Sequence, residues 1–245
     1  MAKLSVGIIG TGFGAKVHAP AFRTIPGVEV MAIAGQDRRK AALAGQTLGI
    51  PTVHDSWQQL IDDEKVEAVV VAVPPSAHFD VVTAALRAGK HVLCEKPFGV
   101  DAGQAARMWE LARASDRVCM VDYMFRMAPE RVRLKELLDG HEIGRIIRVT
   151  VEWTVRGRAA GNSAWSWQFD PSFGGGVLFA FGAHVVDYLQ WLVGPVRSVA
   201  ARLSTRGGPA QFVPMDRPVA ADTLDAMLLL EGDIPVSITV SNATP

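Results

Sequence analysis

Cysteine is scarce in this chain, and an excess of charge of either sign is absent. The 245 residues include two cysteines, Cys94 and Cys119, which stand beside apolar runs and are interpreted as small buried side chains. Two such cysteines give neither a disulfide framework nor the ligand spacing of a metal site, so we expect no metal and a reducing compartment. Lysine plus arginine and aspartate plus glutamate both number 25, for a net charge of zero. We therefore expect neither nucleic acid nor a membrane surface as a partner.

Signs of export and of membrane insertion are lacking as well. The first apolar segment, residues 4–9, is too short for the core of a signal peptide and runs into a glycine-rich turn. No apolar run approaches the length of a membrane span, and long repeats and low-complexity segments are missing. Hydrophobic residues make up 49% of the chain and charged residues 20%, which is typical of globular proteins. We expect a cytoplasmic protein with one large or two ordinary domains.

What the sequence does contain is a glycine-rich turn directly after that first apolar segment. A helix-like pattern follows the turn, which consists of Gly10, Thr11, Gly12, Phe13, Gly14 and Ala15. In a dinucleotide-binding unit, Gly10 would allow the turn, Gly12 would let the backbone approach a pyrophosphate, and the small Ala15 would let the helix pack on the strand. The free N–H groups and the positive dipole end of the helix would then face the phosphates. We predict that these six residues bind NADP or NAD.

The residues after the second predicted strand bear on the choice between these two cofactors. That strand covers residues 28–34 and closes on Gly35. An acidic residue there would bond the ribose hydroxyls of NAD and repel the extra phosphate of NADP. Gly35 removes that acid and Arg38 begins a basic stretch, which favours NADP. NAD stays possible because Asp37 could turn back to the ribose, and the basic residues could be only the solvated start of a helix.

Strands and helices alternate through the first half of the chain. Helices are predicted over residues 15–24, 38–48, 56–61, 78–88 and 102–114, and further strands over residues 68–73, 89–94 and 118–121. The strand at residues 68–73 is apolar on both sides of its pleat, as in a parallel strand covered on both faces. The spacing predicts right-handed crossovers and a doubly wound sheet. Pro74 ends this strand. His78 begins the next helix. It could lie near the cofactor ribose or have a purely structural role, and the sequence favours neither.

Glu95, Lys96 and Pro97 directly follow the strand at residues 89–94. Ligands of open α/β sheets bind beyond the carboxyl ends of the strands, so Lys96 is placed for chemistry. A lysine here can donate a hydrogen bond to a substrate oxygen where charge develops during hydride transfer. On position alone, a loop lysine paired with Glu95 is the alternative. Asp101 and Gln104 then resemble a capping box for the next helix.

The pattern changes after about Tyr123. A helix is predicted over residues 129–138, and a strand over residues 146–155 places Arg, Thr, Glu and Thr on one face. A glycine turn at residues 174–176 leads into the helix that carries His184 and Asp187. Further strands are predicted over residues 196–203, 224–230 and 235–240. Trp165, with Trp167 and Phe169, could form the wall of a sugar pocket or could simply pack at the domain junction.

These motifs, in this order, resemble the Gfo/Idh/MocA family of glucose–fructose oxidoreductase and inositol dehydrogenase. Besides the glycine turn, the resemblance rests on HAPAF at residues 18–22, VPPSAH at 73–78, GKHVLCEKP at 89–97, YxxRxxP at 123–129 and GGGxLxxxGxHxxD at 174–187. It extends over nearly the whole chain.

The resemblance implies an α/β fold with two domains. Residues 1–122 would form a doubly wound, dinucleotide-binding Rossmann domain. Residues 123–245 would form an α+β domain with an open, mostly antiparallel sheet for substrate binding and subunit pairing. It also implies an NAD(P)-dependent oxidoreductase that acts on CH–OH groups of a sugar-like or polyol-like small molecule, as a homodimer or homotetramer. Family members are usually longer, so we predict a truncated chain, or one that leans on a partner to cover its sheet.

Individual site residues follow from the resemblance in the same way. Lys96 would be the catalytic lysine next to the nicotinamide, and His184 the general acid/base that moves the hydroxyl proton. Pro97 would follow a cis peptide bond. The cofactor-binding set would include Gly35, Arg38, Pro74, His78, Glu95, Lys96 and Pro97, and the substrate side Tyr123, Arg126, Asp187 and Trp165.

One position departs from the family pattern. An aspartate commonly stands four residues before the histidine, on the same helical face, where this chain has Ala180. Alanine cannot orient His184 or bind a substrate hydroxyl, which indicates a less hydroxylated substrate or a loss of enzymatic function. Two alternatives stay open: a nucleotide-binding regulator or sensor of the same fold, and a sugar oxidoreductase or isomerase that keeps and recycles its nucleotide.

Overall fold

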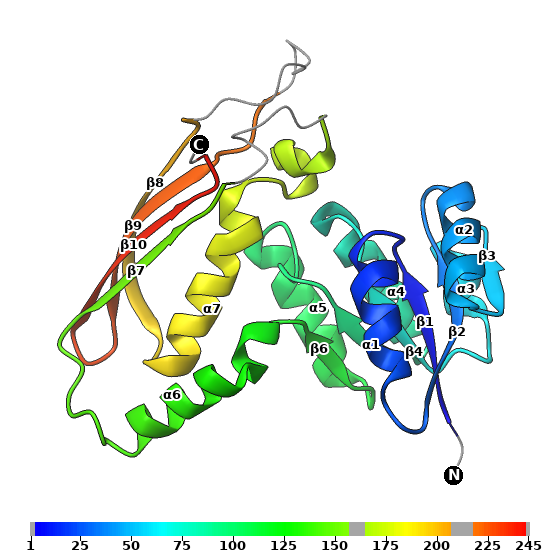
Figure 1. Ribbon diagram of the computed structural model, residues 1–245, viewed down its shortest axis with the longest axis horizontal. Coiled ribbons are helices and arrows are strands. Elements are labelled where there is room, and N and C mark those ends of the chain that lie inside the picture. The colour runs from blue at the N-terminus through cyan, green and yellow to red at the C-terminus, as the bar shows by residue number, and fades with distance from the viewer. Residues whose placement is uncertain (1–2, 157–164, 207–217, 244–245) are drawn as a thin grey trace. The chain divides into compact units, whose positions relative to one another are not determined.

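The computed structural model describes residues 3–156, 165–206 and 218–243 (Figure 1). Contacts within the chain divide it into two compact units, Met1–Asp122 and Tyr123–Pro245. We call these the first unit and the second unit and describe each by itself.

A parallel six-stranded sheet forms the middle of the first unit. Its strands lie in the order β3-β2-β1-β4-β5-β6, and each neighbouring pair runs parallel. They are β1 (Leu4–Ile9), β2 (Val28–Ala34), β3 (Thr52–His54), β4 (Ala68–Val71), β5 (His91–Cys94) and β6 (Cys119–Val121). This is a doubly wound order, so the predicted fold of this part of the chain is confirmed.

Helices cover both faces of this sheet (Figure 1). They are the π-helical turn η1 (Gly14–His18), α1 (Ala19–Arg23), α2 (Arg38–Leu48), α3 (Trp57–Asp62), α4 (His78–Arg87) and α5 (Ala102–Ala114). Along β4, Val69 and Val71 pack into one buried cluster with Leu60, whereas Val70 packs into another with Ile8. Burying a valine side chain fully stabilises the fold by roughly 1.5–3 kcal/mol. The continuous apolar run therefore holds helices on both sides.

Polar side chains cap the N-termini of α2, α3 and α5, at Asp37, Ser56 and Asp101. The hydroxyl of Ser56 accepts a hydrogen bond from the Gln59 N–H at 3.2 Å, and the Asp101 carboxylate accepts one from the Gln104 N–H at 2.8 Å. The expected cap at Asp101 is confirmed. The side chain of Gln104 in turn accepts from the N–H of Val100, at 3.4 Å.

Several predicted boundaries in the first unit were wrong by one or two residues; the strand predicted over residues 89–94, for example, begins at His91. The helix predicted over residues 15–24 begins at Gly14 with a π-helical turn, closed by the Ala19 N–H on the Gly14 carbonyl. The strand predicted over residues 68–73 ends at Val71. Pro75 then opens a short 3-10 turn, η2 (Pro75–Ala77), because proline has no N–H to continue a ladder.

A mixed four-stranded sheet dominates the second unit. Its order is β7-β10-β9-β8, with β10 parallel to β7 and antiparallel to β9, and β9 antiparallel to β8. The predicted open, mostly antiparallel sheet is confirmed. The strands are β7 (Val149–Thr154), β8 (Val196–Ser204), β9 (Thr223–Leu230) and β10 (Ile234–Ser241). The helical segments are η3 (Met124–Met127), α6 (Pro129–Asp139), η5 (Trp167–Phe169), η6 (Pro171–Phe173), the π-helical η7 (Leu178–Gly182) and α7 (Ala183–Leu192).

Helix α7 packs its apolar side against this sheet. Val185 and Leu189 share a buried cluster with Leu228 and Ile238, and Figure 1 shows α7 lying alongside the strands. On β7, the side chains of residues 150, 152 and 154 are exposed, as the alternating pattern predicts. Strand β8 is exposed along most of its length, and its Val199 is 64% exposed.

The segment Pro171–Leu192 is long and apolar enough to cross a membrane by length and composition alone. This corrects the expectation that no apolar run approaches such a length. The window has a mean hydropathy of 1.2, and 39% of it is buried. Core helices of water-soluble proteins pass the same test. Because α7 packs its apolar side on the sheet of its own unit, the segment is weak evidence for a membrane span.

Candidate active site

The glycine turn after β1 has the geometry that close backbone approach requires. Gly10 has a φ of 127°, and a Cβ there would lie 2.1 Å from the Ala72 carbonyl oxygen, so no other residue fits. A Cβ on Gly12 would meet no atom within 4 Å, which leaves the backbone open on that side. A Cβ on Gly14 would lie 2.9 Å from the Ile8 side chain. The turn therefore fits a pyrophosphate laid against its backbone.

The neighbours of these glycines complete the turn. Ala15 is buried, and Phe13 is 44% exposed with its ring edge-on to His18, at 5.2 Å between centroids. The Thr11 side chain lies against Gly35, where a Cβ would come within 2.6 Å of the Thr11 methyl carbon. Packing against Thr11 therefore favours glycine at position 35, whatever the cofactor preference.

The polar residues near Gly35 have partners within the protein. The carboxylate of Asp37 accepts hydrogen bonds from the N–H groups of Arg39 and Lys40, at 2.9 and 3.3 Å, and so caps α2. Arg38 forms an ion pair with Asp55, and both side chains are exposed. The cap gives Asp37 a structural role beside the possible contact with a ribose.

Lys96 follows β5 at the carboxyl end of the sheet, and its bond to Pro97 is cis, as expected. Its backbone N–H donates to one carboxylate oxygen of Glu95 at 3.2 Å. The other oxygen of Glu95 lies 2.8 Å from Nε2 of His18. Burial lowers the pKa of Lys96, while the negative charges of Glu95 and Asp122 act in the opposite direction.

His78 is completely buried at the start of α4. Its Nδ1 lies 2.8 Å from the Pro97 carbonyl oxygen and its Nε2 lies 2.9 Å from the Val73 carbonyl oxygen. Burial lowers the pKa of this imidazole, although both carbonyls oppose the shift. The ring therefore ties the end of β4, next to Pro74, to the segment that carries Lys96, which supports the structural interpretation.

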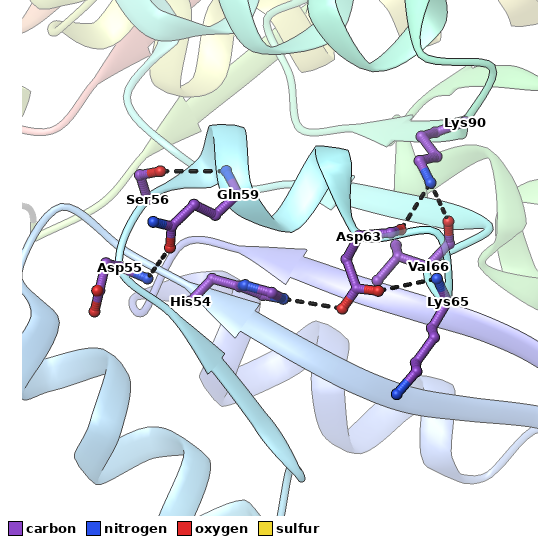
Figure 2. A network of polar contacts seen from close by, with 8 residues as sticks. All are labelled: His54, Asp55, Ser56, Gln59, Asp63, Lys65, Val66 and Lys90. Carbon is purple, nitrogen blue, oxygen red and sulfur yellow. Dashed lines mark hydrogen bonds and ion pairs between the residues drawn. The ribbon is translucent and has the colours of Figure 1, made fainter.

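Lys90 belongs to the same motif as Lys96 but is held inside the first unit. Its Nζ donates to the carbonyl oxygens of Asp63 and Val66, at 2.9 and 2.6 Å (Figure 2). Figure 2 also shows the His54 ring beside the Asp63 carboxylate, with Nε2 and Oδ2 separated by 3.1 Å. This network fixes the connection between α3 and β4.

In the second unit, His184 lies in the first turn of α7 and is 7% exposed. Aromatic rings surround it: the Phe125 centroid lies 4.4 Å from that of the imidazole, and the Tyr123 centroid 6.0 Å away. Ala180, on the preceding π-helical turn, offers no side-chain hydrogen bond. The surroundings of His184 are therefore more apolar than an aspartate at position 180 would make them.

Arg126 and Asp187 pair with each other. Nε of Arg126 donates to one oxygen of Asp187 at 2.8 Å, and its NH2 group donates to the other. Such a two-point pair fixes both side chains, and it raises the pKa of Arg126. Trp165 stacks on Phe169 with 5.8 Å between ring centroids, so it packs within the second unit.

A cavity of about 580 Å³ lies in the second unit between α6, β7 and α7, and His184 is part of its wall. Phe125, Trp153 and Tyr188 also form this wall. The guanidinium group of Arg131 lies over the rings of Phe125 and Tyr188, at 4.2 and 4.6 Å from their centroids. Sequence reasoning missed these residues, because only the packed helices bring them together.

Sequence reasoning also missed Asp122 and gave His18 no role. Asp122 directly follows β6, and its N–H donates to the Cys94 carbonyl at 2.8 Å. The rule that pointed to Lys96, a polar residue just past a parallel strand, applies equally to Asp122.

Two family descriptions match the chain. Residues 4–123 match the oxidoreductase family with an NAD-binding Rossmann fold, and residues 132–245 match the GFO/IDH/MocA C-terminal domain. The predicted resemblance is thereby confirmed.

Individual relatives agree with these matches. An uncharacterized oxidoreductase of Synechocystis sp. is 34% identical over 243 residues, which cover 98% of this chain and 66% of that protein. Levoglucosan dehydrogenase of Pseudarthrobacter phenanthrenivorans is 31% identical over 241 residues, covering 95% and 60%. A solved structure of levoglucosan dehydrogenase in complex with NADH and levoglucosan is similar with a TM-score of 0.91 at 29% identity, covering 99% of this chain and 68% of that chain.

The chain spans 60 to 66% of the length of these two curated relatives. Both of its units are covered by the family matches. The chain belongs to the Gfo/Idh/MocA family of oxidoreductases.

Proposed function

We propose that this chain acts as an NAD(P)-dependent oxidoreductase on a CH–OH or carbonyl carbon of a sugar-like small molecule. The observation that carries the proposal is the pairing, within one sheet, of a glycine turn open at Gly12 with a partly buried lysine directly after β5. When bound, the nicotinamide cofactor would accept or supply the hydride.

The first unit would hold the cofactor. Backbone N–H groups of residues 10–15 would bind its phosphates, and Pro74, His78, Glu95 and Pro97 would shape the wall beside Lys96. We propose NADP as the preferred form, with NAD as the alternative. Gly35 supports this preference because an acidic side chain there would have to displace Thr11. Arg38 would add positive charge near the ribose, although it is also paired with Asp55.

Lys96 and His184 would divide the work on the substrate oxygen. In the oxidative direction, His184 would take the hydroxyl proton while the carbon gives up its hydride. Lys96 would donate a hydrogen bond to the oxygen as negative charge develops there. In the reductive direction, His184 would return the proton. The burial of His184 and the partial burial of Lys96 support these roles, since hydrogen bonds to developing charge are stronger away from water.

The second unit would shape the substrate side. Tyr123 and Trp165 would supply ring surface, and the paired Arg126 and Asp187 would hold the wall in place rather than bind a hydroxyl with a free carboxylate. Ala180 and the rings around His184 favour a substrate with fewer hydroxyl groups than an open-chain polyol. The levoglucosan dehydrogenase among the relatives supports a sugar-like substrate.

The sheet of the second unit would pair subunits. Val199 and Leu203 on β8 are 64% and 48% exposed, and exposed apolar side chains on an edge strand are typical of a surface that meets another chain. We expect a homodimer or homotetramer, which sedimentation analysis of the purified protein would measure. A stable monomer at micromolar concentration would contradict this part of the proposal.

The proposal is tested by following nicotinamide absorbance while aldoses, anhydrosugars and polyols are added with NADP or NAD. We expect turnover with at least one anhydrosugar or aldose and strongly reduced turnover in His184→Asn. Folded protein that binds cofactor but turns over no member of these classes would contradict the oxidoreductase assignment.

A further inference from the structure

A cluster of three ionisable side chains lies at the carboxyl ends of β5 and β6, next to Lys96. His18 stands at the end of η1, Glu95 directly after β5 and Asp122 directly after β6. Nε2 of His18 lies 2.8 Å from Glu95 and 3.7 Å from Asp122. The three side chains are only 8%, 14% and 21% exposed. We call them the His18 cluster.

The backbone fixes each member of the His18 cluster. The N–H of Glu95 bonds to the Val71 carbonyl at 2.9 Å, and the N–H of Asp122 bonds to the Cys94 carbonyl at 2.8 Å. The backbone hydrogen bonds of the sheet therefore continue to the two residues that carry these carboxylates. His18 closes the π-helical turn that begins at Gly14, and such turns are frequent at functional sites. The cluster thus joins the phosphate-binding turn to the lysine segment.

We infer that His18, Glu95 and Asp122 are positioning residues for Lys96. His18 donates from Nε2 to one oxygen of Glu95 and so holds this carboxylate in place. The other oxygen of Glu95 accepts a hydrogen bond from the backbone N–H of Lys96, and the negative charges of Glu95 and Asp122 favour the protonated form of the partly buried ammonium group. The inference rests on the proposed function only in naming Lys96 as the catalytic lysine.

The electrostatics of the cluster agree with this geometry. Burial lowers the pKa of Lys96, and the charges of Glu95 and Asp122 counteract that shift. Burial also works to raise the pKa of Glu95, but the hydrogen bond and charge of His18, with the charge of Lys96, leave it below its usual value. Burial and the charge of Glu95 raise the pKa of Asp122. The two carboxyl groups therefore differ, and Glu95 is the one that His18 keeps ionised.

From the described elements, two further titratable groups interact with Glu95 or Lys96, and a third interacts with one of these two. They are the imidazole of His78 on α4 and the thiols of Cys94 on β5 and Cys119 on β6. Burial lowers the pKa of His78 and raises the pKa of both thiols. The pKa of Cys119 rises to about 11. None of the three adds charge at neutral pH, so Glu95 and Asp122 remain the main influence on Lys96.

A divalent cation is the competing occupant of the cluster. The ligand atoms of the three residues lie within 4.8 Å of one another, a spacing that a small cation can bridge. Two features favour the proton-sharing arrangement. Nε2 of His18 already contacts Glu95 at hydrogen-bond distance, and the neighbouring Lys96 contributes positive charge that would repel a cation.

The experiment measures the titration of Lys96 directly, without cofactor or substrate. The intact protein is labelled with trace acetic anhydride between pH 6 and pH 11, roughly the range in which shifted lysines titrate, and Lys96 acetylation is quantified by peptide mass spectrometry. The exposed Lys40 serves as the internal reference. We expect the midpoint of Lys96 to fall by about one pH unit in Glu95→Gln and in Asp122→Asn, since each removes an opposite charge.

Two substitutions at His18 separate its hydrogen bond from its bulk. Glutamine can present an N–H close to the place of Nε2, so His18→Gln should leave the Lys96 midpoint near that of the wild type. Leucine fills space but cannot donate, so His18→Leu should lower the midpoint in the same direction as Glu95→Gln. Equal Lys96 midpoints in His18→Gln and His18→Leu would show that the hydrogen bond of His18 does not position Lys96.

The chain offers a matched control in the His54–Asp63 pair (Figure 2). This pair also joins Nε2 of a histidine to a carboxylate, at 3.1 Å, with side chains 16% and 20% exposed. Asp63→Asn should lower the thermal unfolding temperature about as much as Glu95→Gln, since each removes a carboxylate with a lowered pKa and a hydrogen bond to a histidine, without moving the Lys96 midpoint. A shift of the same size in Asp63→Asn would show a general loss of structure and would overturn the inference.

Two other results would also overturn it. An unchanged Lys96 midpoint in both Glu95→Gln and Asp122→Asn would show that the carboxylates do not act on the lysine. Saturable stabilisation of the wild type by micromolar Zn²⁺, lost in all three cluster variants, would assign the cluster to a metal. Failure of the protein to bind NAD(P) would contradict the proposed function but would leave the Lys96 midpoints, and this inference, intact.

Discussion

The two units place their candidate catalytic residues in opposite kinds of surroundings. Lys96 in the first unit lies among charged and hydrogen-bonding side chains at the ends of parallel strands. His184 in the second unit lies among aromatic rings on a helix that packs on a mixed sheet. The first arrangement is set by backbone geometry and fixed charges, whereas the second depends on the packing of side chains. Substitutions near Lys96 should therefore act mainly through charge and hydrogen bonding, and substitutions near His184 mainly through packing.

The largest expected effect is on turnover, at Lys96. Lys96→Ala should reduce kcat by about 10²–10³-fold, the loss typical of removing one donor to a developing oxyanion. Cofactor affinity should stay nearly unchanged, which calorimetry would measure. Lys90→Ala is the control, because Lys90 donates to the backbone carbonyls of Asp63 and Val66 inside its own unit and should affect stability more than kcat. Retained turnover in Lys96→Ala would remove the lysine from the mechanism.

The next effect is on stability, and it contrasts two glycines of one turn. Gly10→Ala forces a Cβ to within 2.1 Å of the Ala72 carbonyl at a φ of 127°, and should destabilise the protein by about 3 kcal/mol. Gly12→Ala meets no atom within 4 Å and should leave urea unfolding nearly unchanged while weakening cofactor binding. Equal stability losses in the two variants would contradict the geometry of the turn.

A smaller effect should follow from placing a carboxylate at position 180, where the family commonly has an aspartate and this chain has Ala180. Ala180→Asp adds an acceptor one turn before His184, and should raise kcat/KM for polyhydroxylated substrates by about tenfold, since a hydrogen bond to a charged group contributes roughly 1.5 kcal/mol. Ala183→Asp, also on this helical segment, is the control for added charge. An equal gain in both variants would show that charge alone, and not the position relative to His184, is responsible.

The smallest effect concerns the pH dependence of stability. The pKa of Glu95 is lowered in the folded protein, so its ionised form stabilises the fold above the usual pKa of a glutamate. That contribution is lost as the pH falls through the lowered folded pKa. Glu95→Gln should therefore destabilise the protein by about 1 kcal/mol near neutral pH and less in acid.

Asp122 should behave in the opposite sense. Its pKa is raised by burial and by Glu95, so its ionised form opposes folding, and stability is gained as the pH falls into its titration range. Asp122→Asn should be neutral or stabilising at pH 7 in urea unfolding. A loss of stability as large as that of Glu95→Gln would show that the two carboxylates are equivalent, contrary to their different contacts with His18.

Features set by neighbouring residues could be predicted from the sequence, whereas features set by packing between distant segments could not. The glycine turn, the doubly wound order and the cap at Asp101 follow from local rules, because glycine conformation, buried strands and N-caps are recorded in neighbouring residues. The helical cap at Asp37 was not predicted, and a structural role for His78 was one of two alternatives, since the same residue type suits either role. The rings of Phe125 and Trp153 near His184 come together only through packing between distant segments, which no local pattern records.

The most direct test of the account is a calorimetric titration of the purified chain with NADPH and NADH. We expect saturable binding of one nucleotide per chain, tighter for NADPH, strongly weakened in Gly12→Ala and retained in Lys96→Ala. Tighter binding of NADH would assign the ribose contact to Asp37 instead of Arg38. Binding of neither nucleotide by folded protein would contradict the central claim that the first unit holds a nicotinamide cofactor.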